Sequence, residues 1–174
     1  MFTRAAVVAT VRSSLAFELD DDIVVAKYWL EFCAELVGES DDSFLDYAYQ
    51  GQRARLAILT DDIESARFGV SALKACTGGH AVGNSYVTTL RLGLARMEND
   101  MEQVKVLTPQ LLESHRQEKR QLGQDFRACQ LYQSLVLLGE HGKAEQLLYG
   151  YVRELRRERT PLPRYLSNHY SRLT

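Results

Sequence analysis

A short pattern recurs four times along the chain at nearly even spacing, with copies that begin at positions 19, 59, 97 and 137. Each copy begins with a large apolar residue, places an acid three positions later and a small or β-branched residue four positions after that acid. The copies are LDDDIVVA (19–26), LTDDIESA (59–66), MENDMEQV (97–104) and LLGEHGKA (137–144). Self-similarity at a fixed period is typical of repeat proteins, so the pattern predicts a stack of similar structural repeats.

The residue types in each copy fit a tight turn between two helices. In the second copy, Leu59 is expected to end one helix and Asp62 to begin the next. There the carboxylate can accept hydrogen bonds from free backbone N–H groups and meets the positive end of the helix dipole. The small residue, Ala66, lets the second helix approach the first closely. Each repeat is therefore predicted to be a helix pair that buries its apolar face only by stacking on a neighbour.

Helical periodicity extends this interpretation to most of the chain. Apolar residues recur with i, i+3, i+4 spacing in 22–37, 62–77, 127–138 and 141–157, and neither a hairpin turn nor a long alternating strand pattern occurs. We therefore predict an all-α fold, a right-handed α-solenoid of about four antiparallel helix pairs, in one domain spanning 1–174. The predicted repeats are roughly 1–38, 39–79, 80–117 and 118–160, and 161–174 is predicted to be a short capping helix.

The third repeat departs from the others at Thr108 and Pro109. Threonine followed by proline fits a helix start, with Thr108 as the cap and Pro109 at the first helical position. The alternative is a kink inside a longer helix. This repeat is therefore expected to be the irregular one.

Composition fits a globular protein. The 174 residues are 45% apolar and 25% charged, which is ordinary for a folded domain and excludes a disordered chain. No stretch reaches 18 uninterrupted apolar residues, so no membrane span is predicted. The apolar run after Arg4 is soon interrupted by Arg12, so it is expected to be a helix of the mature fold rather than a signal peptide. Tyr28, Trp29 and Phe32 are expected to be core residues.

The sequence contains no local arrangement that is typical of a catalytic, metal or cofactor site. Three cysteines, Cys33, Cys76 and Cys129, form no CxxC pair and are predicted to be reduced and buried in a cytoplasmic protein. None of the four histidines has a second His or a Cys at ligand spacing. The glycines around Lys143 lack the spacing of a phosphate loop. We predict that the chain is not an enzyme and holds no metal or cofactor; an enzyme with a dispersed active site is the alternative.

Charge is unevenly distributed along the chain. Residues 1–65 hold 13 acidic and 5 basic residues, whereas residues 66–174 hold 10 acidic and 16 basic residues. The distribution is explained by solvated helix faces, by head-to-tail association of copies through their ends, or by a basic surface for an acidic partner. The densest basic stretch, 153–164, is interrupted by Glu154 and Glu158 and lacks aromatics in register. Direct nucleic-acid contact is therefore not predicted.

The fourth turn, Gly139-Glu140-His141-Gly142-Lys143-Ala144, resembles the tetratricopeptide-repeat turn Gly-Asp-Tyr-x-x-Ala, and the other three resemble it more loosely. The repeats here are longer, at roughly 40 residues against about 34 in that family. The Trp and Leu-Gly early in the family's first helix are also missing. Such long repeats are similar to those of large ATP-dependent transcription activators of the maltose-regulator type, most clearly in 118–152.

The resemblance implies a non-enzymatic protein-protein interaction module that binds a protein or peptide, as the helical-repeat sensor or scaffold part of a transcription regulator. The alternative is a small helical-repeat chaperone that holds an extended partner, as in type III secretion. In the resembled family, the first helix of each pair lines a concave groove for partner peptides. Counting back from each turn assigns five residues to that groove: Glu18, Arg55, Thr89, Arg96 and Gln133.

Two of these residues, Arg55 and Arg96, are suited to grip a carboxylate of a bound peptide. Solvated helix charges are the alternative explanation for both. The aromatic residues Phe44, Tyr47 and Tyr49 are expected either to anchor a partner or to fill the seam between the first and second repeats.

Overall fold

The computed structural model describes residues 2–20, 22–38, 42–76, 84–117 and 124–157. The regular elements within these ranges are all helices, which confirms the all-α prediction. They are α1 (Phe2–Asp20), α2 (Ile23–Gly38), α3 (Ser43–Leu59), α4 (Ile63–Cys76), α5 (Asn84–Met97), α6 (Met101–Gln117), α7 (Gln124–Leu137) and α8 (His141–Arg157). The predicted capping helix at 161–174 lies outside the described residues.

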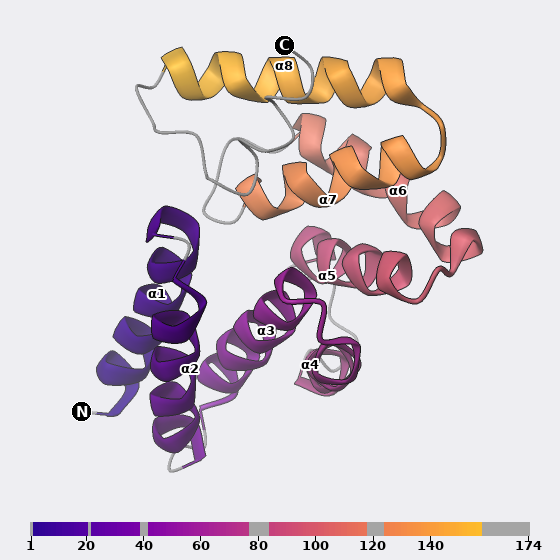
Figure 1. Cartoon of the computed structure of the whole chain (residues 1–174). Coiled ribbons are helices and arrows are strands. Elements are labelled where there is room, and N and C mark those ends of the chain that lie inside the picture. The colour runs from indigo at the N-terminus through magenta and orange to yellow at the C-terminus, as the bar shows by residue number, and fades with distance from the viewer. Residues whose placement is uncertain (1, 21, 39–41, 77–83, 118–123, 158–174) are drawn as a thin grey trace. The chain divides into compact units, whose positions relative to one another are not determined.

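The helices form two compact units (Figure 1). Unit 1, Met1–Gly83, contains α1 to α4, and unit 2, Asn84–Thr174, contains α5 to α8. Within each unit, consecutive helices pack against each other as pairs: α1 with α2, α3 with α4, α5 with α6, and α7 with α8. Each of the four predicted repeats therefore encloses one helix pair.

Three of the turns inside these pairs share one backbone geometry. The second residue after the helix end has a positive φ, which is 56° at Asp61, 55° at Asn99 and 75° at Gly139. The next amide donates to the carbonyl five positions earlier: Asp62 to Ala57 at 2.9 Å, Asp100 to Ala95 at 2.9 Å, and Glu140 to Leu135 at 2.8 Å. These features define the Schellman motif that ends many α-helices. As predicted, α3, α5 and α7 end at the large apolar residue of the pattern: Leu59, Met97 and Leu137.

The acid of each pattern lies at the start of the second helix. Three of the acids accept a hydrogen bond from the amide three positions later: Asp22 from Val25 at 2.9 Å, Asp62 from Ser65 at 3.1 Å, and Asp100 from Gln103 at 3.1 Å. The fourth, Glu140, instead forms an ion pair with the Lys143 ammonium. The predicted capping role is confirmed for the three aspartates, which satisfy N–H groups that the helix leaves without a partner.

The small or β-branched residue of each pattern occupies the same place in all four pairs. Its amide donates to the carbonyl of the acid four positions earlier, and its side chain is at most 1% exposed. These residues are Ala26, Ala66, Val104 and Ala144. The second pair also approaches closely one turn further along α4, where a Cβ added to Gly69 would meet the Ala54 Cβ at 2.8 Å.

The core of unit 1 includes a cluster of small residues from α1 and larger ones from α2 and α3. Ala6 and Ala9 pack with Cys33 and Leu45, and four partly buried residues pack against them: Trp29, Leu36, Val37 and Tyr49. The Ser13 hydroxyl donates to the Ala26 carbonyl at 2.8 Å, which ties α1 to α2. Burial raises the pKa of the Cys33 thiol, so this buried cysteine stays protonated at neutral pH.

Unit 2 has two apolar clusters. One joins α7 to α8 through Ala128, Cys129, Leu148, Tyr151, Val152 and Leu155. The other joins α5, α6 and α7 through Leu92, Ala95, Val104, Leu107, Leu111 and Leu131, with Leu112, Leu138 and Leu147 packed against it. Cys33 and Cys129 are buried free thiols, as predicted, and the Cys76 side chain lies outside the described residues.

Two expectations from the sequence are wrong. Pro109 does not start a helix but lies inside α6, because Asp100 already caps that helix and its buried face continues past Pro109 to Leu111. The proline is exposed, and the Thr108 hydroxyl donates to the Val104 carbonyl at 2.7 Å. Tyr28 and Phe32 are not core residues, since they are 62% and 38% exposed on the outer side of α2.

Candidate functional site

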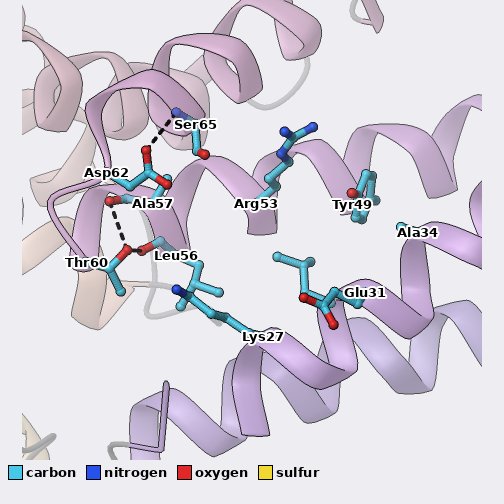
Figure 2. A pocket seen from close by; sticks show the side chains of 11 residues that line it. Lys27, Glu31, Ala34, Tyr49, Arg53, Leu56, Ala57, Thr60, Asp62 and Ser65 are labelled. Carbon is cyan, nitrogen blue, oxygen red and sulfur yellow. Dashed lines mark hydrogen bonds between the residues drawn. The ribbon is translucent and has the colours of Figure 1, made fainter. Parts of the chain in front are cut away.

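A groove of about 290 Å³ opens to solvent within unit 1, between α2, α3 and the start of α4. Figure 2 shows Tyr49 and Ala34 at one end of it and Thr60 with Asp62 at the other. The buried leucines Leu30 and Leu56 contribute apolar surface to its lining. Its volume is close to the lower end of the range for ligand-binding clefts, roughly 300 Å³.

The end of the groove near Thr60 is fixed by local hydrogen bonds. The Thr60 hydroxyl donates to the Leu56 carbonyl at 3.0 Å, and the Asp62 carboxylate accepts from the Ser65 amide. The hydrogen bonds from Ser65 hold the pKa of Asp62 below its ordinary value, with a further contribution from the nearby charges of Lys27 and Arg53. Asp62 is therefore an ionised cap at neutral pH rather than a proton donor.

The rim of the groove carries charges of both signs. Lys27 and Glu31 project from α2, and Arg53 lies opposite them on α3 (Figure 2). The guanidinium carbon of Arg53 lies 4.3 Å from the ring centroid of Phe68, in a cation–π contact between α3 and α4. Arg53 is thus held at the rim by an exposed aromatic ring.

Unit 2 carries larger apolar residues at three of the positions that line the groove in unit 1. The patterns that begin at 19 and 59 recur at 97 and 137 with the same separation, so α2, α3 and α4 align without gaps with α6, α7 and α8. Three groove positions, Ala34, Arg53 and Thr60, correspond to Leu112, Leu131 and Leu138. Those three leucines pack together in one apolar cluster. Unit 2 therefore clusters leucines at three positions where unit 1 has a smaller or polar side chain beside an open groove.

At two further positions in the groove, unit 1 has the larger apolar residue and unit 2 the smaller polar one. Leu30 and Leu56 correspond to Thr108 and Ser134, whose hydroxyls donate to the Val104 and Gln130 carbonyls of their own helices. Unit 1 thus has leucines at these two positions, where unit 2 has hydroxyl residues. It has no leucine at positions 34, 53 and 60, where unit 2 has three. The result is a groove, open to solvent, that is lined by both apolar and polar residues.

The five residues that the sequence pattern assigned to a partner groove do not line this one. Glu18 lies on α1, and its side chain is outside the described part of the chain. Arg55 is 4% exposed on α3, Thr89 is 1% exposed on α5, and Arg96 and Gln133 are half-buried on α5 and α7. Their role in partner binding stays a prediction.

Two of those five residues take part in polar contacts within unit 2. Arg96 donates to the side-chain carbonyl of Gln130, and the Thr89 hydroxyl donates to the Ser85 carbonyl at 2.6 Å. The Ser85 hydroxyl in turn accepts from Arg127 at 2.9 Å. The Arg96–Gln130 and Arg127–Ser85 hydrogen bonds connect α5 to α7, so substitutions at Arg96 affect packing within the unit as well as any partner.

Arg53 and Tyr49 are the groove residues with the clearest sequence signals. Arg53 aligns with Leu131 of unit 2, so comparing the two halves of the sequence shows a charged residue where the other half has an apolar one. Tyr49 belongs to the aromatic group of Phe44, Tyr47 and Tyr49, and it both packs on the unit 1 cluster and lines the groove. Phe44, from the same group, is exposed instead.

The groove is suited to recognition. Its apolar surface can bury a hydrophobic side chain, and its rim can pair with charges of either sign. Within the described ranges, no three His, Cys, Asp or Glu side chains are placed to hold a metal ion. The same ranges contain no helix with the length and apolar character needed to cross a membrane.

Comparison of the chain with protein-family models, curated proteins and solved structures finds no match.

Proposed function

We propose that this chain is a non-enzymatic protein-protein interaction module and that the groove of unit 1 is its binding site. The observation that supports this proposal is the comparison between the two units. Where unit 2 places Leu112, Leu131 and Leu138 in one cluster, unit 1 has Ala34, Arg53 and Thr60 around an open groove. Burying the apolar surface of the groove against a partner would gain about 25 cal/mol for each Å² removed from water.

The groove has the composition of a protein-binding surface. Its apolar centre is flanked by Arg53 and Tyr49, and arginine and tyrosine are enriched among the residues that contribute most to protein interfaces. Lys27 and Glu31 lie at the edge of the groove, where their charges remain in contact with water. Such charges contribute more to the choice of partner than to the strength of binding.

The biological setting we propose is the sensor or scaffold part of a transcription regulator. Its support is the resemblance of 118–152 to the repeats of maltose-regulator-type activators. A genomic reading frame that continues into a DNA-binding domain would support this setting. A frame that encodes no such domain would count against it.

A groove-filling variant tests the binding site. Ala34→Leu combined with Thr60→Leu introduces the residues that unit 2 carries at these positions, so the helices are expected to accept them. Ser71→Leu, on the exposed side of α4, is the matched control for added apolar surface. Each protein is used to capture partners from a lysate of the source organism, and captured proteins are then purified and titrated by calorimetry.

We expect a partner that binds the parent protein and Ser71→Leu with the same affinity and binds the filled variant at least 10-fold more weakly. Circular dichroism should give the filled variant a melting temperature equal to or above that of the parent. Equal binding by all three proteins would contradict the assignment of the groove as the binding site.

A further inference from the structure

We infer that the groove of unit 1 accepts a leucine-sized aliphatic side chain from an amphipathic segment of a partner protein, with a carboxylate of the same segment bound at Arg53 and Lys27. This inference rests on the proposed function and specifies the chemistry of the partner.

The aliphatic preference follows from the residues at the corresponding positions of unit 2. Ala34 is three carbons smaller than Leu112, and Thr60 is shorter than Leu138 and carries a hydroxyl that bonds to its own helix. Leu112 and Leu138 pack against the cluster that contains Leu131. Because unit 1 has the same helix order around this space, a branched aliphatic side chain supplied from outside is the closest substitute for the missing leucines.

The carboxylate preference follows from the hydrogen-bonding groups that remain for a partner. Among the four charged residues of the rim, Asp62 accepts the Ser65 amide as the cap of α4. The Arg53 guanidinium makes a cation–π contact with Phe68, and such a contact does not use up its hydrogen-bonding N–H groups. Together with Lys27 it presents two positive charges, which the carboxylates of Glu31 and Asp62 balance, so the preference rests on the hydrogen-bonding geometry of Arg53 rather than on net charge. Arginine edges bind carboxylates through paired hydrogen bonds, so an acidic residue beside the aliphatic one is favoured.

The amphipathic character of the partner segment follows from the opening of the groove. Its apolar surface lies between two helices and is open to solvent, and the rim on both sides is charged. A segment that binds there therefore buries one face and leaves the other in water. A helix laid in a groove or a short extended segment satisfies this requirement.

A peptide-display library of random 16-residue segments tests the inference with the full chain as bait. The library is selected on the parent protein and counter-selected on Ala34→Leu/Thr60→Leu, and Ser71→Leu is the control bait. We expect the enriched peptides to carry Leu, Ile or Val with Asp or Glu within one helical turn of it. Replacing that aliphatic residue by Ala in a selected peptide should weaken binding about 10-fold or more.

The charge requirement is tested separately. Arg53→Gln is expected to remove the enrichment of Asp and Glu while keeping that of aliphatic residues. Groove-dependent peptides that lack aliphatic residues, or that favour Lys and Arg, would overturn the inference and leave the proposed function intact. A selection in which no peptide distinguishes the parent from the filled variant would overturn both.

Discussion

Replacing Gly139 by Ala tests the turn geometry that the helix pairs share. Gly139 has a φ of 75°, and a Cβ added there meets no atom within 4 Å. The substitution therefore causes no steric clash with other residues and changes only the backbone energy. For an L-residue the left-handed conformation costs roughly 1–2 kcal/mol. Alanine also lowers the conformational entropy of the unfolded chain, which offsets about 0.4–1 kcal/mol of that cost. We expect Gly139→Ala to lower the free energy of unfolding by about 1 kcal/mol.

The chain contains a control in which the same substitution has the opposite effect. Gly150 lies in the middle of α8, and a Cβ added there also meets no atom within 4 Å. Because alanine is the better helix former, Gly150→Ala is expected to raise the free energy of unfolding by about 0.8–1 kcal/mol. Urea titrations followed by circular dichroism should therefore separate the two variants by about 2 kcal/mol, the sum of those estimates. Equal stability of Gly139→Ala and Gly150→Ala would refute the cost assigned to a left-handed residue at this turn.

Two further substitutions probe unit 1. Gly69→Ala is expected to lower the free energy of unfolding by about 1–3 kcal/mol, because its Cβ would lie 2.8 Å from that of Ala54. Calorimetry should show partial recovery when Ala54→Gly is added, and no recovery would argue against this close contact. Asp62→Asn keeps a capping oxygen and removes the charge. Since the fold lowers the Asp62 pKa, the charged cap contributes stability at neutral pH and loses it as pH falls through that lowered pKa. The parent protein should therefore exceed Asp62→Asn in unfolding free energy at pH 7, and the difference should shrink as the solution is acidified; a difference that grows in acid would contradict this sign.

The sequence predicts the helix pairs well because local chemistry determines them. The start of α4 depends on an acid with the right spacing to cap it, and Asp62 supplies that cap. The end of α3 depends on the large apolar residue Leu59 followed by residues that tolerate a turn. The four buried small positions follow from the same short pattern. None of these features depends on residues far away in the chain.

The groove is harder to predict because it is formed by side chains that are small or polar. Ala34 and Thr60 are ordinary helix and turn residues when considered alone. They indicate an open space only when they are aligned with Leu112 and Leu138 in the other half of the chain. Counting back from the turns selects Arg55, whereas the groove is lined by Arg53. Those two residues are about 200° apart around α3, so a difference of two positions moves a side chain to another face.

A prediction from the preference of a single residue fails where the surrounding helix determines its position instead. Pro109 favours a helix start, but Asp100 caps α6 earlier and the apolar face of that helix runs past the proline. Tyr28 and Phe32 have large apolar surfaces, yet the inward face of α2 is already occupied by Ala26, Leu30 and Cys33. The helical phase of α2 therefore places both aromatic residues outside.

Methyl NMR of leucine-labelled protein tests the central claim, that unit 1 binds a partner segment in a groove lined at positions where unit 2 has clustered leucines. A peptide selected by display is titrated into the full chain. We predict chemical-shift changes at the methyl groups of Leu30 and Leu56 in the groove, and unchanged methyl signals from the buried Leu111 and Leu148 of unit 2. Shifts confined to unit 2, or a bound peptide that leaves Leu30 and Leu56 unchanged, would contradict it.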